Sequence, residues 1–268
     1  MGGRAIRIGG GLSGLGVIIA LAYVILGGNP SDIIQVFQGD QPYSVDSGHV
    51  LTEKEKEMGD FVSTVLADIE NVWRDQFQQM GLTYQEPTLV LFSGEVSTAS
   101  GYASASTGPF YSPEDSKVYI DLTFFEDMQR RLGAPGDFAL AYVLAHEVGH
   151  HVQNLLGTNE KVIAQRDRMR EKDFNKLMVR MELQADFLAG VWAHYAKEIP
   201  DYLEETDIEE GLNAASAVGD DRIMKQTQGY VVPDAFTHGT SEQRVRWFRK
   251  GLDTGDINQG DTFGASSL

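Results

Sequence analysis

The stretch AHEVGHHVQ, residues 145–153, restricts the fold more than any other feature of this chain. It lies in the segment FALAYVLAHEVGHHVQNLL (138–156), which is apolar on one side, contains no proline and predicts a buried helix. At about 100° per residue, His146 and His150 project one turn apart on one side of that helix, so both imidazoles can reach one tetrahedral zinc ion. A catalytic zinc ion takes three protein ligands and a water, so a third ligand must come from elsewhere in the chain.

The remaining polar residues of the motif point in other directions. Glu147 lies about 60° from His150 around the helix, which keeps its carboxylate near the open position of the metal without making it a ligand. That is the placement of a general base that takes a proton from zinc-bound water. His151 lies about 140° from His146, so it cannot share the ion and is expected to hydrogen-bond to a neighbouring element.

The third ligand is predicted in the segment RMELQADFLAGVWAHY, residues 180–195. Glu182 and Asp186 are four residues apart on a second apolar helix, and carboxylates in such surroundings are costly to bury unless they are paired or bind metal. We assign Glu182 as the third zinc ligand and Asp186 as the acceptor that orients a ligating imidazole. The alternative is a surface ion pair of either acid with Arg180 or Arg170.

Composition excludes several classes of function. The chain has 268 residues, of which 42% are hydrophobic, enough for one sizeable globular domain. It contains 39 acidic and 22 basic residues, so its net charge of -17 would repel a phosphate backbone and argues against nucleic-acid binding. It contains no cysteine, so zinc must be held by His, Asp or Glu.

The N-terminus predicts a membrane anchor. No charged residue occurs from Ile8 to Gly28, and at about 1.5 Å per residue this helix would span the ~30 Å hydrocarbon core of a bilayer. Arg4 and Arg7 precede the run, so the N-terminus is expected in the cytoplasm and the rest of the chain outside, in a single-pass cell-membrane protein. A cleaved signal peptide ending near Ala-Leu-Ala (20–22) is the alternative, although this motif falls inside the apolar run.

Three parts follow from these patterns: a cytoplasmic stub and transmembrane anchor at 1–28, a linker or arm at 29–50, and a soluble domain at 51–268. Within the domain, Thr52 and Glu55 form a capping box at the start of a helix. The expected elements are that helix to about residue 80, strands at 88–92 and 117–125 joined by a small-residue stretch, helices with short breaks from 135 to 195, and helices near 207–227 and 240–251.

Three motifs, HEVGHHVQ, MELQADFLAGVWA and FTHGTSEQRVRWF, together resemble those of the neutral zinc metallopeptidases, a family of membrane-anchored bacterial proteins within the gluzincin type. The resemblance covers roughly residues 30–263. It implies a zincin-like α+β fold, mostly helical with a small sheet. It also implies one zinc ion per chain with the same assignments that the spacing gives: His146, His150 and Glu182 as ligands, Glu147 as base, and Asp186 behind the first histidine.

The resemblance also assigns a role to the third motif. In similar peptidases a Thr-His segment followed by a Glu-x-Arg turn supplies an oxyanion-stabilising residue, which would be His238 here, with Arg244 positioning it. From the residues alone, THGTSEQRV is first the start of a helix with Thr240 or Ser241 as N-cap, and Arg244 is an ordinary salt-bridge residue.

The sequence departs from the family pattern at its cysteines. Family cysteines flank the GPFY segment and recur after the acid of ELQAD and before the DTF tail, where this chain has Ser100, Ser112, Phe187 and Gly260. The cysteines are lost in pairs, so the resemblance implies that packing replaces disulfides here.

We therefore expect a membrane-anchored zinc endopeptidase that cleaves peptides or proteins. The strand KVYIDLTFF (117–125) is the candidate edge that would pair with an extended substrate. The alternative from another class is a catalytically inactive zinc-containing interaction module at the membrane. Hydrolysis of a non-peptide amide also fits the spacing.

Overall fold

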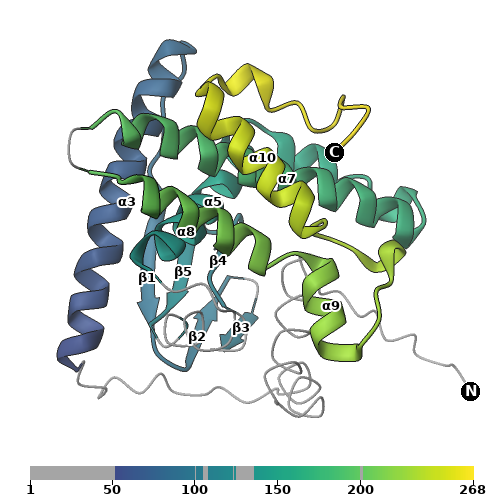
Figure 1. Ribbon diagram of the computed structural model, residues 1–268, viewed down its shortest axis with the longest axis horizontal. Coiled ribbons are helices and arrows are strands. Elements are labelled where there is room, and N and C mark those ends of the chain that lie inside the picture. The colour runs from purple at the N-terminus through teal and green to yellow at the C-terminus, as the bar shows by residue number, and fades with distance from the viewer. Residues whose placement is uncertain (1–51, 100, 105–107, 123, 125–135, 200–201) are drawn as a thin grey trace, which may run out of the picture.

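The computed structural model describes residues 52–99, 101–104, 108–122, 124, 136–199 and 202–268. This part of the chain is a mostly helical α+β fold with a small three-stranded sheet, as the sequence predicts (Figure 1). Its longer elements are α3 (Glu53–Gln79), β1 (Thr88–Phe92), β2 (Glu95–Thr98), β3 (Gly101–Ser104), β4 (Phe110–Ser112), β5 (Lys117–Asp121), α5 (Asp137–Leu155), α6 (Thr158–Ile163), α7 (Glu171–Lys197), α8 (Glu205–Ala217), α9 (Asp220–Gln228) and α10 (Ser241–Thr254). Short 3-10 turns lie at Arg166–Arg168, Pro233–Ala235 and Ile257–Gln259.

The segment expected to anchor the protein, residues 8–28, lies outside the described residues, as does the predicted linker at 29–50. Among the helices that are described, none is both long enough and apolar enough to span a membrane.

The order of the three-stranded sheet corrects one prediction. β5 pairs in parallel with β1 and antiparallel with β4, so the sheet order is β1-β5-β4 and β5 is the central strand. The substrate edge predicted at 117–125 is therefore wrong, because both sides of β5 are already hydrogen-bonded. Part of the small-residue stretch between the two predicted strands forms β4 and the β2-β3 hairpin.

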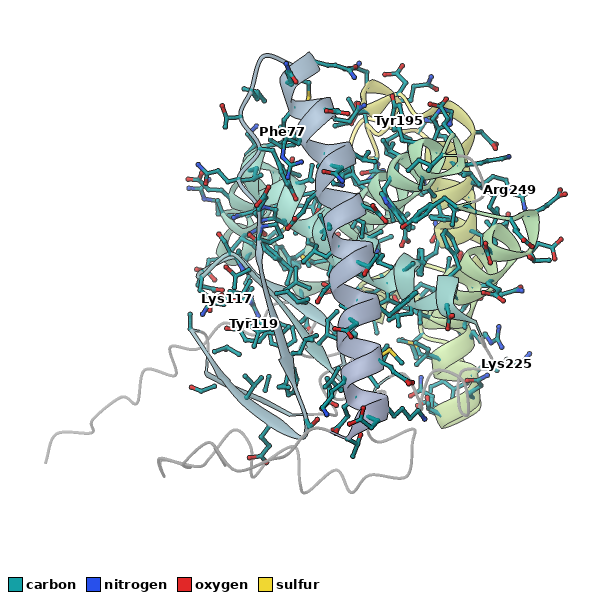
Figure 2. All side chains as sticks on the ribbon, turned by 90° about the vertical axis from the view of Figure 1, so that its left-hand side faces the viewer. Phe77, Lys117, Tyr119, Tyr195, Lys225 and Arg249 are labelled. Atoms are coloured by element: carbon teal, nitrogen blue, oxygen red, sulfur yellow. The ribbon has the colours of Figure 1, made fainter. Side chains whose placement is uncertain are left out.

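Helix α3 begins and ends as its sequence predicts. The Thr52 side chain accepts a hydrogen bond from the Glu55 N–H at 3.2 Å, and the Glu55 carboxylate accepts one from the Thr52 N–H at 2.7 Å. Figure 2 shows α3 lying lengthwise over one face of the molecule, with Lys117 and Tyr119 of β5 to one side and Arg249 of α10 to the other. Its buried stripe, which includes Trp73, packs in the main core.

Glycines bring the three central helices into close contact. A Cβ atom on Gly149 would lie 2.9 Å from the carbonyl oxygen of Ala185, so α5 and α7 can approach this closely only because position 149 has no side chain. Gly190 of α7 and Gly251 of α10 face one another in the same way, each within 2.0 Å of the opposite backbone if given a Cβ. These two crossings place α7 between the other two helices (Figure 1).

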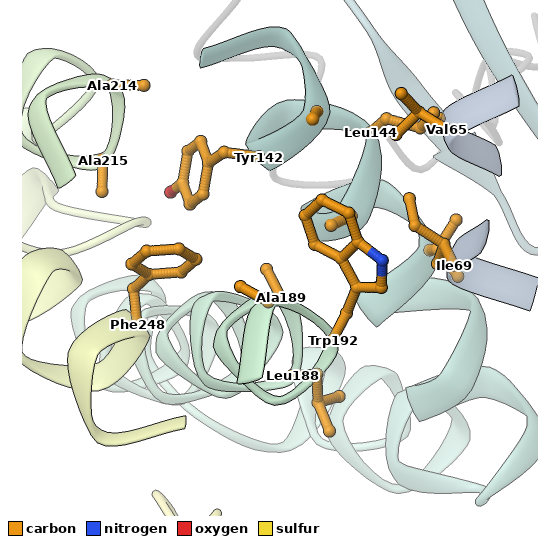
Figure 3. Close-up of a cluster of buried hydrophobic side chains, with 14 of the residues drawn as sticks. Val65, Ile69, Tyr142, Leu144, Leu188, Ala189, Trp192, Ala214, Ala215 and Phe248 are labelled. Atoms are coloured by element: carbon orange, nitrogen blue, oxygen red, sulfur yellow. The ribbon is translucent and has the colours of Figure 1, made fainter. Parts of the chain in front are cut away.

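The hydrophobic core fills the space between α3, α5, α7, α8 and α10. Figure 3 shows Trp192 of α7 facing the residues of α3, and the ring of Tyr142 facing Phe248 of α10. The Tyr142 and Phe248 ring centroids are 5.2 Å apart in an edge-to-face arrangement. Tyr142 therefore packs against α10 from α5, the helix that also carries the predicted ligands His146 and His150.

Two of the positions that take the place of family cysteines lie in contact. A Cβ atom on Gly260 would lie 2.6 Å from the ring of Phe187, so the Phe187 side chain occupies the space beside a residue that has none. This packing joins α7 to the residues that follow α10 without a disulfide. Ser112 is buried in β4, and Ser100 lies outside the described residues.

Candidate metal centre

The three predicted ligands meet in the interior. Nε2 of His146 lies 3.2 Å and Nε2 of His150 lies 3.3 Å from the same oxygen, Oε2 of Glu182. Ligands bonded to zinc at 2.0–2.1 Å in a tetrahedron are separated by about 3.3–3.4 Å, so these two distances are those of tetrahedral edges. His146, His150 and Glu182 form a group that could hold a metal ion.

The charge and the hydrogen bonding around this group both suit a divalent cation. Nε2 of His150 and Oε1 of Glu182 are buried without a hydrogen-bond partner, which is costly unless another group satisfies them. Arg244 neutralises Asp186, which leaves Glu147 and Glu182 as two buried carboxylates. A divalent ion would balance both charges and bind the unpaired atoms, so the residues fit zinc.

His146 is oriented by a charged group. Its Nδ1 lies 2.8 Å from Oδ1 of Asp186, and because a carboxylate only accepts, the ring donates its Nδ1–H and keeps the Nε2 lone pair for a metal. Burial would lower the pKa of His146, but the Asp186 and Glu182 carboxylates outweigh this and raise it to about 9. Without metal, this imidazole therefore also carries a proton on Nε2 at neutral pH and is positively charged, and a metal would take the place of that proton.

His150 is oriented by a neutral group. Its Nδ1 lies 2.9 Å from Oε1 of Gln153, whose Nε2 donates to the Met181 carbonyl at 2.7 Å and to Oε1 of Gln184 at 3.1 Å. The two acceptors around Nε2 fix the orientation of the Gln153 amide, so its oxygen must face His150. His150 thus adopts the same tautomer as His146, with Nε2 free for a metal.

The structure corrects the predicted partner of Arg244. Its Nε and Nη2 atoms donate to the two oxygens of Asp186, each at 2.8 Å, and Nη2 also donates to the hydroxyl of Tyr142 at 3.2 Å. Among the described residues no hydrogen bond joins Arg244 to His238. A planar guanidinium matches a carboxylate in two-point contact, so Arg244 positions Asp186 and, through it, His146.

Arg180 and Arg170, the partners considered for Glu182 and Asp186, lie elsewhere. Arg180 donates to carbonyls of the C-terminal residues, and Arg170 pairs with Asp173. Burial would raise the pKa of Asp186, but Arg244 and His146 hold it below its ordinary value, so this carboxylate stays ionised.

Glu147 lies beside the ligands and is held by the sheet. Its Oε2 accepts a hydrogen bond from the backbone N–H of Tyr111 in β4 at 2.9 Å. Burial raises the pKa of Glu147 above its ordinary value, and the neighbouring His146 and His150 partly offset that rise. A carboxylate with a raised pKa, close to the ligands but outside them, is suited to accept and return a proton.

His238 reaches the group of candidate ligands from the loop before α10. Its Nε2 lies 3.8 Å from Oε2 of Glu182, and the residue is buried. The loop is held by Asp220, whose Oδ2 accepts hydrogen bonds from the N–H groups of Thr237, His238 and Gly239 at 2.8, 2.7 and 3.0 Å. A carboxylate that accepts three backbone hydrogen bonds fixes the loop, and with it the position of the imidazole.

The helix start expected in the third motif is also present. Thr240 caps α10 in a capping box with Gln243. The sequence therefore serves both purposes, a helix N-terminus and the placement of His238.

His151 and His194 have partners outside the ligand set. His151 contacts the hydroxyl of Tyr111 at 3.0 Å and the carbonyl of Gln85. His194 donates to the carbonyl of Leu252 at 2.7 Å. Both are hydrogen-bonded to neighbouring elements, which is what the sequence predicts for His151.

Three residues that support the site were missed at the level of the sequence: Tyr142, Gln153 and Asp220. The Tyr142 hydroxyl donates to Oδ1 of Asp186 at 2.6 Å. Helical spacing could have indicated two of them, because Tyr142 precedes His146 by four residues and Gln153 follows His150 by three. No local pattern links Asp220 to the loop that it holds.

Comparison with known proteins agrees with this geometry. The family model described as "Putative neutral zinc metallopeptidase" matches residues 1–263. The uncharacterized protein YpfJ of Escherichia coli (strain K12) is 47% identical over 266 residues, which cover 99% of this chain and 92% of that protein. The uncharacterized protein Rv2575 of Mycobacterium tuberculosis (strain H37Rv) is 46% identical over 195 residues, covering 69% of this chain and 65% of that protein. No solved structure matches the chain.

Proposed function

Because the chain belongs to the family described as putative neutral zinc metallopeptidases, we propose that it is a zinc-dependent endopeptidase of the HExxH gluzincin type with one zinc ion per chain. One observation carries the proposal: Nε2 of His146 and Nε2 of His150 converge on one oxygen of Glu182 at 3.2 and 3.3 Å, with Glu147 beside them. This combination supplies three ligands and a base in one buried site.

A zinc ion bound by these residues would polarise the scissile carbonyl and lower the pKa of the attacking water towards ~7. Glu147 then accepts the proton of that water and transfers it to the leaving amine. The Tyr111 N–H holds one oxygen of Glu147, which leaves the other to take the proton. Asp186 and Gln153 keep both imidazoles in the ligating tautomer while this proton moves.

His238 is the proposed oxyanion-stabilising residue. It shares the buried space of the ligands, and the three hydrogen bonds from its loop to Asp220 keep its ring in place during the reaction. A hydrogen-bond donor that is already in position where the oxyanion forms lowers the activation barrier of hydrolysis, because the protein need not rearrange during the reaction. Arg244 acts on the other side of the site, through Asp186.

The substrate is proposed to be an extended peptide that pairs with β4. This strand is at one end of the sheet order, and its outer edge has no partner strand among the described residues. The Tyr111 N–H on this strand already reaches Glu147, so a chain added along β4 would pass beside the base.

Anchoring in the cell membrane through residues 8–28, with a cytoplasmic N-terminus and an extracytoplasmic peptidase domain, is supported by the uncharged run after Arg4 and Arg7. Protease added to intact cells should digest the domain and leave a short protected N-terminal fragment. A domain that stays intact until the cells are lysed would contradict this orientation.

The deciding experiment compares Glu147→Gln with Glu182→Ala in the full-length chain. Wild type should carry about one zinc per chain and cleave an unfolded protein. Glu147→Gln should keep its zinc but lose about 10²–10⁴-fold in hydrolysis, because the amide cannot accept the proton. Glu182→Ala should lose the metal itself.

Each other outcome has a distinct meaning. Full zinc content in Glu182→Ala would exclude Glu182 as a ligand, and unchanged hydrolysis by Glu147→Gln would exclude it as the base. Wild-type protein that holds zinc but cleaves no member of a broad peptide library would favour the interaction module.

A further inference from the structure

A chain of hydrogen bonds, buried at His150 and half-buried at Gln184, leads from one candidate zinc ligand to the residues that follow α10. His150 donates to Gln153, and Gln153 in turn donates to Gln184 of α7 at 3.1 Å. Nε2 of Gln184 then donates to the carbonyl of Gly260 at 2.9 Å. The last partner belongs to the C-terminal tail, residues 256–268, which follows α10.

The C-terminal tail contacts α7 on both sides of the third ligand. Gln184 holds Gly260, and Arg180 donates to the carbonyls of Thr262, Phe263 and Ala265, the last at 3.1 Å. The Thr262 hydroxyl, which is fully buried, donates to the Arg180 carbonyl at 2.6 Å. Positions 180 and 184 lie two residues before and two residues after Glu182, so the tail is built against the turn of α7 that carries a ligand.

We propose that the C-terminal tail is a positioning element of the metal site, acting on His150 through Gln184 and Gln153. The Gly260 carbonyl orients the Gln184 amide so that its oxygen faces Gln153. This fixes the Gln153 oxygen towards His150, and the Nε2 lone pair of His150 towards Glu182. Each amide in this series of hydrogen bonds is oriented by the next, so a displacement of the tail would change the orientation of the His150 imidazole.

This inference rests on the metal site of the proposed function, and zinc affinity tests it without any measurement of hydrolysis. Full-length wild type, Gln153→Leu, Gln184→Leu and Arg180→Met would be titrated with Zn²⁺ against a chromogenic chelator. Gln153→Leu should weaken zinc binding by about 10–100-fold. Gln184→Leu and Arg180→Met should each weaken it by a smaller factor, on the order of 3–10-fold.

The double variant of Gln184 and Arg180 separates the tail from a general loss of packing. If both residues act through the tail, Gln184→Leu should have less effect in the Arg180→Met background than in wild type. Loss of the Arg180 charge near a cation site would by itself strengthen zinc binding, so a weaker affinity in Arg180→Met must come from the displaced tail.

Lys250→Met is the matched control. It also removes a positive charge and a contact with the tail, the 2.7 Å hydrogen bond from α10 to the Gln259 carbonyl, but it leaves the hydrogen bonds of Gln184 and Arg180 to the tail in place. Its zinc affinity should stay within about twofold of wild type, since the Gln184 link to the histidine is intact.

Unchanged zinc affinity in Gln153→Leu would overturn the inference. So would a result in which Gln153→Leu, Gln184→Leu and Arg180→Met lower the unfolding temperature in excess chelator but leave the zinc affinity unchanged. Unchanged affinity in Arg180→Met would remove the tail from the chain. If Gln153→Leu does not fold, the half-buried positions 184 and 180 still decide the question. A wild-type protein that binds no zinc would refute the proposed function instead, so the two failures can be told apart.

Discussion

His146 and His150 lie one turn apart on α5 and face the same oxygen of Glu182, yet they are supported in opposite ways. His146 donates to Asp186, an ionised carboxylate held by Arg244 and Tyr142. His150 donates to Gln153, a neutral amide held by a backbone carbonyl and by Gln184. Both supports select the same tautomer, but only the first brings charge.

The difference shows that both imidazoles are oriented by a hydrogen-bond acceptor, whereas only His146 also has a negative charge beside its Nδ1. The neutral support can only orient its imidazole, and it extends to the C-terminal tail at Gly260. The charged support also favours a positive imidazole, and together with Glu182 it raises the pKa of His146 to about 9 despite its burial. The charged support should therefore matter for stability and for proton release, and the neutral support for the geometry of metal binding.

The largest effect is expected from removal of the cation in the charged support. Arg244→Met takes away the two-point partner of the buried Asp186 carboxylate, and removing one partner of a buried ion pair costs about 3–5 kcal/mol. The free energy of unfolding in urea, measured with excess chelator so that zinc does not contribute, should fall by that amount.

Arg246→Met is the control on the same helix. Arg246 pairs with Glu242 at 2.7 Å in an exposed position, and exposed pairs contribute little. Equal destabilisation by both substitutions would mean that Arg244 acts only as a packed side chain of α10.

A smaller effect is expected in the pH dependence of zinc binding. In the metal-free protein His146 is protonated below its pKa of about 9, and it must lose that proton to bind zinc. Binding at pH 7.5 should therefore release at least one proton, and the zinc affinity should rise by about tenfold per pH unit between pH 7 and 8. Calorimetry in two buffers of different ionisation enthalpy measures the release directly.

Asp186→Asn sharpens the comparison between the two histidines. Without the Asp186 carboxylate, only Glu182 still opposes the effect of burial, so the pKa of His146 should fall and fewer protons should be released at pH 7.5. Gln153→Leu should weaken zinc binding yet leave this release unchanged. Identical binding heats in both buffers for wild type would contradict a protonated His146.

The smallest effect is expected at Tyr142. Tyr142→Phe keeps the ring against Phe248 and removes one hydrogen bond to an Asp186 that still has Arg244 and His146 as partners. The loss in unfolding free energy should be about 1–2 kcal/mol, the usual contribution of a hydrogen bond to a charged group. A loss as large as that of Arg244→Met would show that the hydroxyl, and not the guanidinium, holds Asp186.

Local patterns in the sequence predicted the main helices, strands β1 and β5, and the three candidate ligands that the structure brings together. The capping box at Thr52 placed the start of α3, and helical spacing placed His146, Glu147 and His150. The cost of burying a carboxylate pointed to Glu182, which the structure brings to both histidines. These inferences succeed because helix periodicity and burial act over a few neighbouring residues.

Partners that come from distant parts of the chain were decided only by the tertiary structure. The sequence offered Arg180 and Arg170 as partners of Asp186, whereas the crossing of α7 and α10 at Gly190 and Gly251 brings Arg244 to it. The order of the sheet made β4 its edge in place of β5, and the approach of α5 to α7 at Gly149 set Gln153 against Gln184. Residue types determine which groups need a partner, whereas the close approach of helix backbones determines which partner reaches them.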